Sequence, residues 1–267
     1  MNLSAIRKTE NRWILLAIVL GAQFLNIYAI SWLPISFDSG DNNLAVYQYR
    51  LLSMALSVLL IWVFAPNALR LFRVRIGSYP RSYTAIIFLG FILGSLIYGG
   101  IKDFPILASL DAIVFSLFIG LDEEFFSRVF VYGLLERVGM EFAMVVSALI
   151  FGALHFMNFI YGDESFNYVL GHVIQAAGYG YLMVALMIAT GNVWMPVALH
   201  GLTDLRWVVM DAGEYSEIIS GSTNWLVTVV ITTVHVIAGR ALVGLDRKRI
   251  RLPESWNGAL RWLGLVE

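Results

Sequence analysis

A few ionisable side chains lie within apolar stretches of this chain, where a charge is costly. An ionisable group at the centre of a lipid bilayer costs at least ~2.5–3.5 kcal/mol on insertion scales, so such groups are candidates for a functional site. They occupy three separate stretches: Glu123, Glu124 and Arg128 in the first, His155 in the second, and His200 and Asp204 in the third.

The first stretch contains two adjacent glutamates with different expected surroundings. Glu124 and Arg128 are four residues apart, in the order that favours an ion pair on one helix face, and one interpretation is a self-neutralising structural pair. Glu123 lies about 100° further round the helix, where the sequence offers it no local partner. An unpaired carboxylate inside a membrane bundle is a functional candidate by default. We assign no role to Asp122, which can lie at a hydrated edge.

The four histidines fall into two groups. His155 and His200 lie in apolar contexts, and His200 shares a helix face with Asp204 because the two are four residues apart. One buried histidine is often a core residue satisfied by a carbonyl group. Two histidines, an unpaired glutamate and an aspartate on three neighbouring segments are harder to explain in this way. His172 and His235 have no comparable partner, and we expect both to be mainly structural.

Water, a carboxylate and an imidazole together make a hydrolytic site. A buried Glu123 can act as general base toward water, and His155 can share or orient that water. His200 and Asp204, on another helix, can donate hydrogen bonds to the oxyanion that forms when a carbonyl is attacked. The nucleophile pattern G-x-S-x-G is absent from the sequence. Direct attack by activated water is therefore the simpler chemistry.

Composition places these side chains in a membrane protein. Hydrophobic residues make up 59% of the 267 residues and charged residues only 14%, against about 25% charged in an average soluble domain. So few charges cannot cover the surface of a soluble protein. The net charge of −1 leaves no basic excess for binding nucleic acid. The absence of cysteine excludes disulfides, thiolate metal sites and cysteine nucleophiles.

Eight apolar segments approach the roughly 20 residues that a membrane-spanning helix needs. They are 13–33, 49–66, 84–101, 105–135, 142–160, 168–190, 193–210 and 225–245. We therefore predict an all-α membrane protein, a bundle of about eight transmembrane helices. The connecting loops are short, so residues 1–267 are expected to form one multi-pass domain whose site-bearing core spans about 105–210.

Charges in the loops predict the orientation of the bundle. Lysine and arginine concentrate near the N-terminus, between the second and third segments and in the C-terminal tail, whereas the alternate loops are mostly acidic. The positive-inside rule then places both termini in the cytoplasm. Residues 246–267 form a basic tail with apolar side chains at helical spacing. This predicts a short helix at the membrane interface, with a solvated tail as the alternative.

The ordered motifs resemble those of a known family. They read Glu123-Glu124-x-x-x-Arg128, Phe151-x-x-x-His155 and His200-x-x-x-Asp204. In order, spacing and placement on separate apolar segments, they are similar to the motifs of the CAAX protease and bacteriocin-processing family, also called Abi proteins. This family comprises intramembrane glutamic endopeptidases related to the CAAX prenyl proteases.

The resemblance implies an eight-helix intramembrane fold and hydrolysis of a peptide bond. The roles it implies are water activation for Glu123 and His155, oxyanion stabilisation for His200 and Asp204, and support of the site for Glu124 and Arg128. Many family members carry asparagine where this chain has Asp204. We hypothesise that Asp204 either donates as a neutral carboxylic acid or fixes the tautomer of His200.

Other chemistries and functions stay open. Two histidines and a carboxylate can form a catalytic zinc site. The H-E-x-x-H signature is absent, however, so we expect no metal or other cofactor and keep zinc as the alternative. A non-proteolytic membrane scaffold or immunity partner is a second possible function. A proton-coupled transporter is a third, because intramembrane glutamate and histidine also form proton relays.

The expected partners are the lipid bilayer and a peptide or membrane-anchored protein substrate that is cut near the cytoplasmic side. The resemblance suggests prenylated C-terminal motifs as substrates in eukaryotic relatives. In prokaryotic relatives it suggests bacteriocin maturation, self-immunity or signalling. We expect the prokaryotic cytoplasmic membrane as the location, and the sequence does not indicate an oligomeric state.

Overall fold

The computed structural model describes residues 3–29, 42–73, 106–161, 164–209 and 225–244, and over these residues the chain is helical, without strands. The elements are α1 (Leu3–Lys8), α2 (Arg12–Phe24) with the π-helix η1 (Leu25–Ala29), α3 (Asn42–Phe64), the 3-10 helix η2 (Pro66–Phe72), α5 (Ile106–Glu124), the π-helix η3 (Phe125–Tyr132), α6 (Gly133–Leu135), α7 (Met140–Leu154), α8 (Met157–Tyr161), α9 (Phe166–Thr190), α10 (Trp194–Val209) and α12 (Trp225–Val243).

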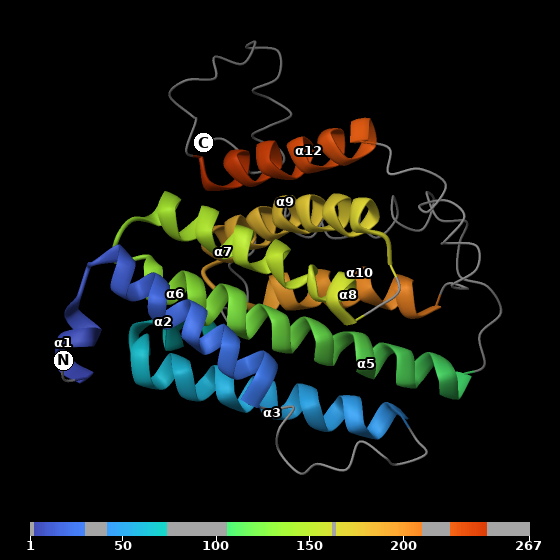
Figure 1. Cartoon of the computed structure of the whole chain (residues 1–267), viewed down its shortest axis with the longest axis horizontal. Helices are drawn as coiled ribbons and strands as arrows, with labels where there is room; N and C mark the ends of the chain where they lie inside the picture. The colour runs from blue at the N-terminus through green and yellow to red at the C-terminus, as the bar shows by residue number, and fades with distance from the viewer. Residues whose placement is uncertain (1–2, 30–41, 74–105, 162–163, 210–224, 245–267) are drawn as a thin grey trace.

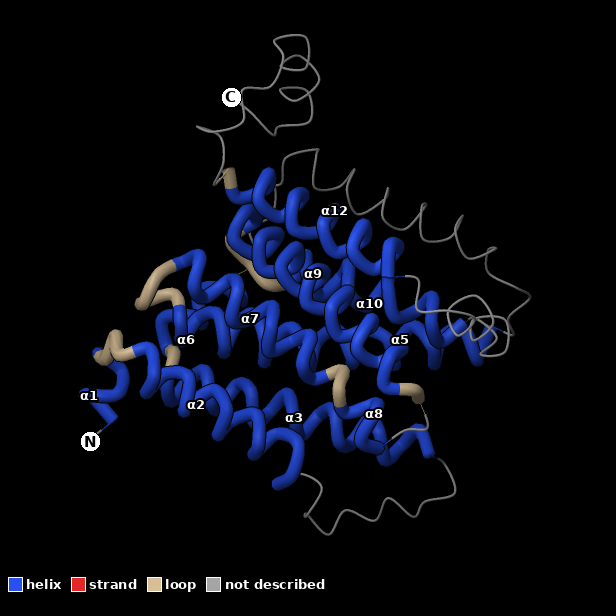
Figure 2. Tube along the Cα trace, turned by 45° about the horizontal axis from the view of Figure 1, so that its top comes forward, coloured by secondary structure: helices blue, strands red, loops and turns tan. Residues whose placement is uncertain are grey.

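Apart from 84–101, which lies outside the described residues, each predicted segment is helical over most of its described part. The tail at 246–267 also lies outside them. Figure 1 shows α3 next to α5 on one side of the bundle and α12 next to α9 on the other, and Figure 2 agrees. Helix α10 packs along α5, and α7 packs along α9. The predicted all-α bundle is confirmed in this respect.

Polarity in the bundle is arranged as expected for a protein in lipid. Large apolar side chains face outward, with Leu226 72% and Trp13 70% exposed, whereas Glu124 and Arg128 are fully buried. The helical segments long and apolar enough to cross a membrane are Tyr47–Phe64, Met140–Ile160 (α7 and most of α8), Phe166–Thr190 and Trp225–Val243. The chain is therefore a membrane protein, in which four described helices meet the requirement for a span.

The predicted segment 105–135 forms one continuous helix from α5 through η3 to α6. It changes from α- to π-helical geometry directly after Glu124, at the start of Phe125–Tyr132. π-Helical turns are rare and occur frequently at functional sites. The change thus falls between Glu124 and its predicted partner Arg128.

The predicted helix over 142–160 is broken at His155, which corrects the expectation of a single element. Helix α7 ends at Leu154, and the amide of His155 donates to the carbonyl of Gly152 at 3.1 Å. The carbonyl of Phe151, which that amide would bond in a continuing α-helix, lies 3.1 Å from His155 Nδ1 instead. The histidine side chain therefore takes the place of its own backbone N–H.

Glycines let the helices that carry the candidate site approach closely. A Cβ atom on Gly120 of α5 would lie 3.0 Å from the carbonyl oxygen of Val197 and 3.1 Å from the amide nitrogen of Gly201, both in α10. The backbones of α5 and α10 are therefore almost in contact just before Glu123 and beside His200. This close crossing brings the first and third motifs together.

The close contact of α7 with α9 predicts a stability effect. A Cβ atom on Gly152 would lie 2.6 Å from the backbone oxygen of Val173 and 3.0 Å from the backbone nitrogen of Ala177. Gly152→Ala must push the two helices apart, so we expect it to lower the free energy of unfolding by about 1–3 kcal/mol. Thermal unfolding of the purified protein in detergent measures this.

Gly21→Ala is the matched control, because a Cβ atom at Gly21 of α2 has no neighbour within 4 Å. It should leave the unfolding temperature unchanged or raise it, since alanine favours a helix over glycine by up to ~1 kcal/mol. A Gly152→Ala protein that unfolds at or above the wild-type temperature would contradict the packing argument.

Candidate active site

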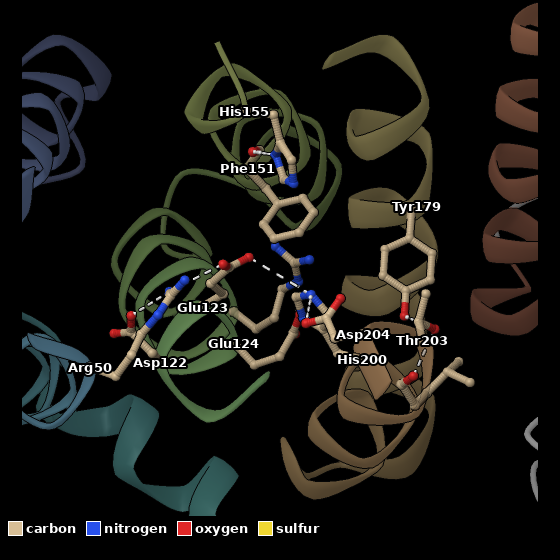
Figure 3. Close-up of polar contacts among 12 residues, drawn as sticks. Arg50, Asp122, Glu123, Glu124, Phe151, His155, Tyr179, His200, Thr203 and Asp204 are labelled. Atoms are coloured by element: carbon tan, nitrogen blue, oxygen red, sulfur yellow. Dashed lines mark hydrogen bonds and ion pairs between the residues drawn. The ribbon is translucent and has the colours of Figure 1, made fainter. Parts of the chain in front are cut away.

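Side chains of the first and third motifs meet where α5 crosses α10 (Figure 3). Glu123 Oε2 lies 3.7 Å from His200 Nε2, and Asp204 Oδ2 lies 3.4 Å from the same nitrogen. Two carboxylates therefore face one imidazole nitrogen from different helices. The predicted pairing of His200 with Asp204 across one helical turn is confirmed, and Glu123 joins it through the crossing.

Glu124 lies behind this cluster and joins two motifs. Its Oε2 is 3.0 Å from Arg128 Nε, which confirms the predicted ion pair, and its Oε1 is 2.9 Å from His200 Nδ1. A carboxylate whose other oxygen is held by arginine accepts a hydrogen bond here, so His200 Nδ1 carries the proton. Glu124 thus fixes the ring of His200, a task that the sequence suggested for Asp204.

Phe151 connects the second motif to the other two. The Arg128 guanidinium carbon lies 4.2 Å from the centroid of the Phe151 ring, a cation–π contact within the buried site. The same ring makes edge contacts with His155 at 5.1 Å and His200 at 5.6 Å between centroids. Figure 3 shows Phe151 between His155 and the Glu123–His200 pair. The three predicted motifs therefore form one cluster.

The hydrogen bond at the end of α7 determines the tautomer of His155. Because the carbonyl of Phe151 can only accept, His155 Nδ1 must donate to it across their 3.1 Å separation. The Nε2 atom of the neutral ring is then left with a lone pair. That nitrogen is suited to accept a hydrogen bond from water or to take up a proton.

Arg50 is a member of this cluster that the sequence reasoning missed. Its Nη1 atom, reaching from α3, lies 2.9 Å from Asp122 Oδ2 and 3.2 Å from Glu123 Oε1. Two expectations are thereby wrong. Glu123 does have a cationic partner, on another helix, and Asp122 is only 4% exposed rather than at a hydrated edge. The sequence could have indicated Arg50, because it lies within an apolar segment next to an acidic loop. The positive-inside rule does not expect an arginine at that end of a span.

Two residues of α9 also extend the site. The His172 ring lies 4.6 Å from that of His155, so the expectation that His172 lacks a comparable partner is wrong. The Tyr179 ring lies 5.8 Å from that of His200, and its hydroxyl is 3.2 Å from Thr203 Oγ1. His172 and Tyr179 are about two helical turns apart and so share one face of α9, a spacing that could have indicated them.

The described residues hold no group of three or more histidine, aspartate and glutamate side chains arranged to bind a metal ion. Both ring nitrogens of His200 face carboxylates within the cluster, Nδ1 toward Glu124 and Nε2 toward Asp204. His155 uses Nδ1 on a carbonyl. The geometry suits hydrogen bonding and proton transfer within this set.

A comparison with protein families supports a peptidase. Residues 105–206 match the family model described as type II CAAX prenyl endopeptidase Rce1-like, and this segment contains all three motifs. This part of the chain is therefore similar to a family of proteases. No curated protein and no solved structure matches the chain. Arg50 lies outside the matched segment.

The buried Glu124–Arg128 pair predicts a large stability effect. Glu124→Gln removes the counter-charge of a fully buried guanidinium, and breaking one partner of a buried pair costs about 3–5 kcal/mol. The double variant Glu124→Gln with Arg128→Met should recover part of this loss, because it leaves no unpaired charge. Denaturation of the purified proteins in detergent measures both.

Glu136→Gln is the control for this prediction. It breaks the Arg70–Glu136 pair, whose arginine side chain is 47% exposed, and exposed pairs contribute about 0–1 kcal/mol. The hydrogen bond to Glu136 raises the pKa of Arg70, and Arg70 Nη2 lies 2.6 Å from Glu136 Oε2. Equal stability of the Glu124→Gln and Glu136→Gln variants would argue against a buried charge pair.

Proposed function

We propose that this protein is an intramembrane endopeptidase that hydrolyses a peptide bond of a peptide or membrane-anchored protein with an activated water. The observation that carries the proposal is the convergence of Glu123 with His200 at 3.7 Å inside an apolar bundle. His155 lies next to this pair across Phe151, with Nε2 able to accept. The family match adds the peptidase class.

In this mechanism Glu123 is the general base. It takes a proton from a water molecule that His155 Nε2 orients by accepting a hydrogen bond, and the oxygen attacks the peptide carbonyl carbon. The tetrahedral intermediate then collapses as the C–N bond breaks. Glu123 returns the proton to the leaving nitrogen, which yields an amine and a carboxylic acid.

His200 and Asp204 stabilise the oxyanion in the proposal. Because His200 Nδ1 donates to Glu124, its Nε2 can donate to an oxyanion only when the ring is an imidazolium. Glu124 therefore supports the charged ring from behind, and Asp204, as a neutral carboxylic acid that can donate, lies 3.4 Å from Nε2, beside the place of the oxyanion. A donor set aimed at the developing charge is the effect that contributes most in acyl transfer.

The finer topology is part of the proposal. Eight transmembrane helices in a single domain over residues 1–267, both termini in the cytoplasm and a location in the prokaryotic cytoplasmic membrane account for the alternating basic and acidic loops. The substrate class is a lipid-anchored or membrane-inserted peptide cut near the cytoplasmic side. An anchored substrate suits a site within the bundle because its apolar anchor already partitions into the bilayer.

One observation favours a second function, that of a non-proteolytic scaffold or immunity partner. Glu124, Arg128 and His200 are buried and linked to one another, so they would be retained for stability alone. Complementation of a deletion strain separates the two functions. Full rescue by variants with substituted catalytic residues would favour the scaffold. Zinc-dependent hydrolysis, the alternative mechanism, would be abolished by exhaustive chelation.

The proposed base predicts a loss of proteolysis. Glu123→Gln and His155→Ala should each lower cleavage by at least ~100-fold, because general acid–base catalysis contributes about 10²–10⁴-fold. Proteomic comparison with wild-type cells should show uncleaved precursors that accumulate. Asp111→Asn is the control, since Asp111 lies on the same helix but pairs with Tyr47, about 18 Å further along the helix from Glu123. Unchanged precursor levels in the Glu123→Gln strain would refute the proposed function.

The position of Asp204 predicts that replacing its carboxyl group with an amide preserves most of the activity. Asp204→Asn keeps a hydrogen-bond donor beside His200 Nε2, so we expect cleavage within ~10-fold of wild type, whereas Asp204→Ala should lose 10²- to 10³-fold as an oxyanion donor does. Rates of precursor cleavage by the purified variants measure this. If Asp204→Asn is as inactive as Glu123→Gln, donation is not its role.

A further inference from the structure

Arg50 stands out because it reaches the candidate base from outside the motifs. It lies on α3, in a helix apolar enough to span the membrane, and outside the segment that matches the family. About one-fifth of its side-chain surface is exposed, and so is about one-fifth of that of Glu123. A charge held at such a place needs a partner that offsets the cost of its desolvation.

Arg50 lies at different distances from its two carboxylate partners, and the difference indicates which of them anchors it. Its Nη1 atom is 2.9 Å from the buried Asp122 and 3.2 Å from Glu123. The shorter contact goes to the more deeply buried carboxylate, which therefore anchors the guanidinium. Arg50, held in this way, fixes Oε1 of Glu123 and leaves Oε2 directed toward His200.

Local charge gives a second reason for the arrangement. Asp122, Glu123 and Glu124 are three successive acids, and Arg128 is engaged by Glu124 through Nε. Without Arg50, the carboxylates of Asp122 and Glu123 would lie side by side in a low-dielectric bundle without the guanidinium that both contact. Like charges in that setting disfavour the ionised form that a general base requires.

We propose that Arg50 is a positioning residue that holds the Glu123 carboxylate ion-paired and oriented toward His200, with Asp122 as its anchor. This inference rests on the proposed function of Glu123 as the base. It adds α3 to the elements that build the site and assigns Asp122 a task in the hydrolysis. Arg50 acts through Glu123 and does not itself touch the reacting atoms.

The kinetic test uses a synthetic peptide spanning the bond of a precursor that accumulates in the Glu123→Gln strain. Arg50→Gln should lower kcat by about 10- to 100-fold, the effect of misplacing a catalytic group by about 1 Å. KM should change less than about 2-fold, because the lost interaction matters in the transition state. Arg50→Lys should be intermediate, since an ammonium group keeps the charge but lacks the planar fork.

Tyr47→Phe is the matched control for docking of α3. It breaks another polar contact between these helices, the 2.8 Å hydrogen bond from Tyr47 to Asp111, and leaves Glu123 untouched. If Arg50 serves only to hold α3 on α5, the Arg50→Gln and Tyr47→Phe proteins will show the same kcat and the same unfolding temperature. That result would overturn the proposal.

A second measurement does not depend on proteolysis. Dicyclohexylcarbodiimide, an apolar reagent, modifies protonated carboxyl groups and spares ion-paired carboxylates, and mass spectrometry of the labelled full-length protein locates the adduct. Arg50→Gln should increase labelling of Glu123 at least several-fold over wild type, whereas Tyr47→Phe should not. Unchanged labelling refutes the role of Arg50 even if no peptide is cleaved. Increased labelling without any cleavage by wild type refutes the proposed function alone.

Discussion

The hydrogen-bonded contact between Glu124 and His200 is the interaction on which the candidate site depends. Through it, one fully buried carboxylate joins α5 to α10 and also neutralises Arg128. An isolated carboxylate or guanidinium could not stay in this interior, because the desolvation of either ion would exceed what packing returns. Each group is therefore tolerated because the others are in place, and the three motifs form one electrostatic unit.

The sequence predicted contacts along a helix better than contacts between helices. Spacing by four residues places two side chains on one face whatever the helix packs against. The Glu124–Arg128 and His200–Asp204 pairs could therefore be predicted from the sequence. The pairing of Arg50 with Glu123 joins residues on different helices. It depends on how α3 is rotated about its axis and where it crosses α5, and apolar spacing reports neither.

The break at His155 was missed for a different reason. Apolar residues continue on both sides of it, and the hydropathy of 142–160 is that of a single span. What ends α7 is a competition between the imidazole and the backbone N–H of the same residue for the carbonyl of Phe151. Periodicity reports average burial along a helix and does not report a competition between two donors for one acceptor.

Accessibility of the cluster differs between its two sides. The side chains of Glu124 and Arg128 are sealed from solvent, whereas Glu123 is 21% and Asp204 18% accessible. The accessible side of the cluster is therefore the one that Glu123 and Asp204 line, and the buried Glu124 holds His200 from the opposite side. The cluster thus has one accessible side and one buried side. In the proposed mechanism a scissile bond would meet the base and the oxyanion donors on this side, and the buried Glu124–Arg128 pair lies behind them.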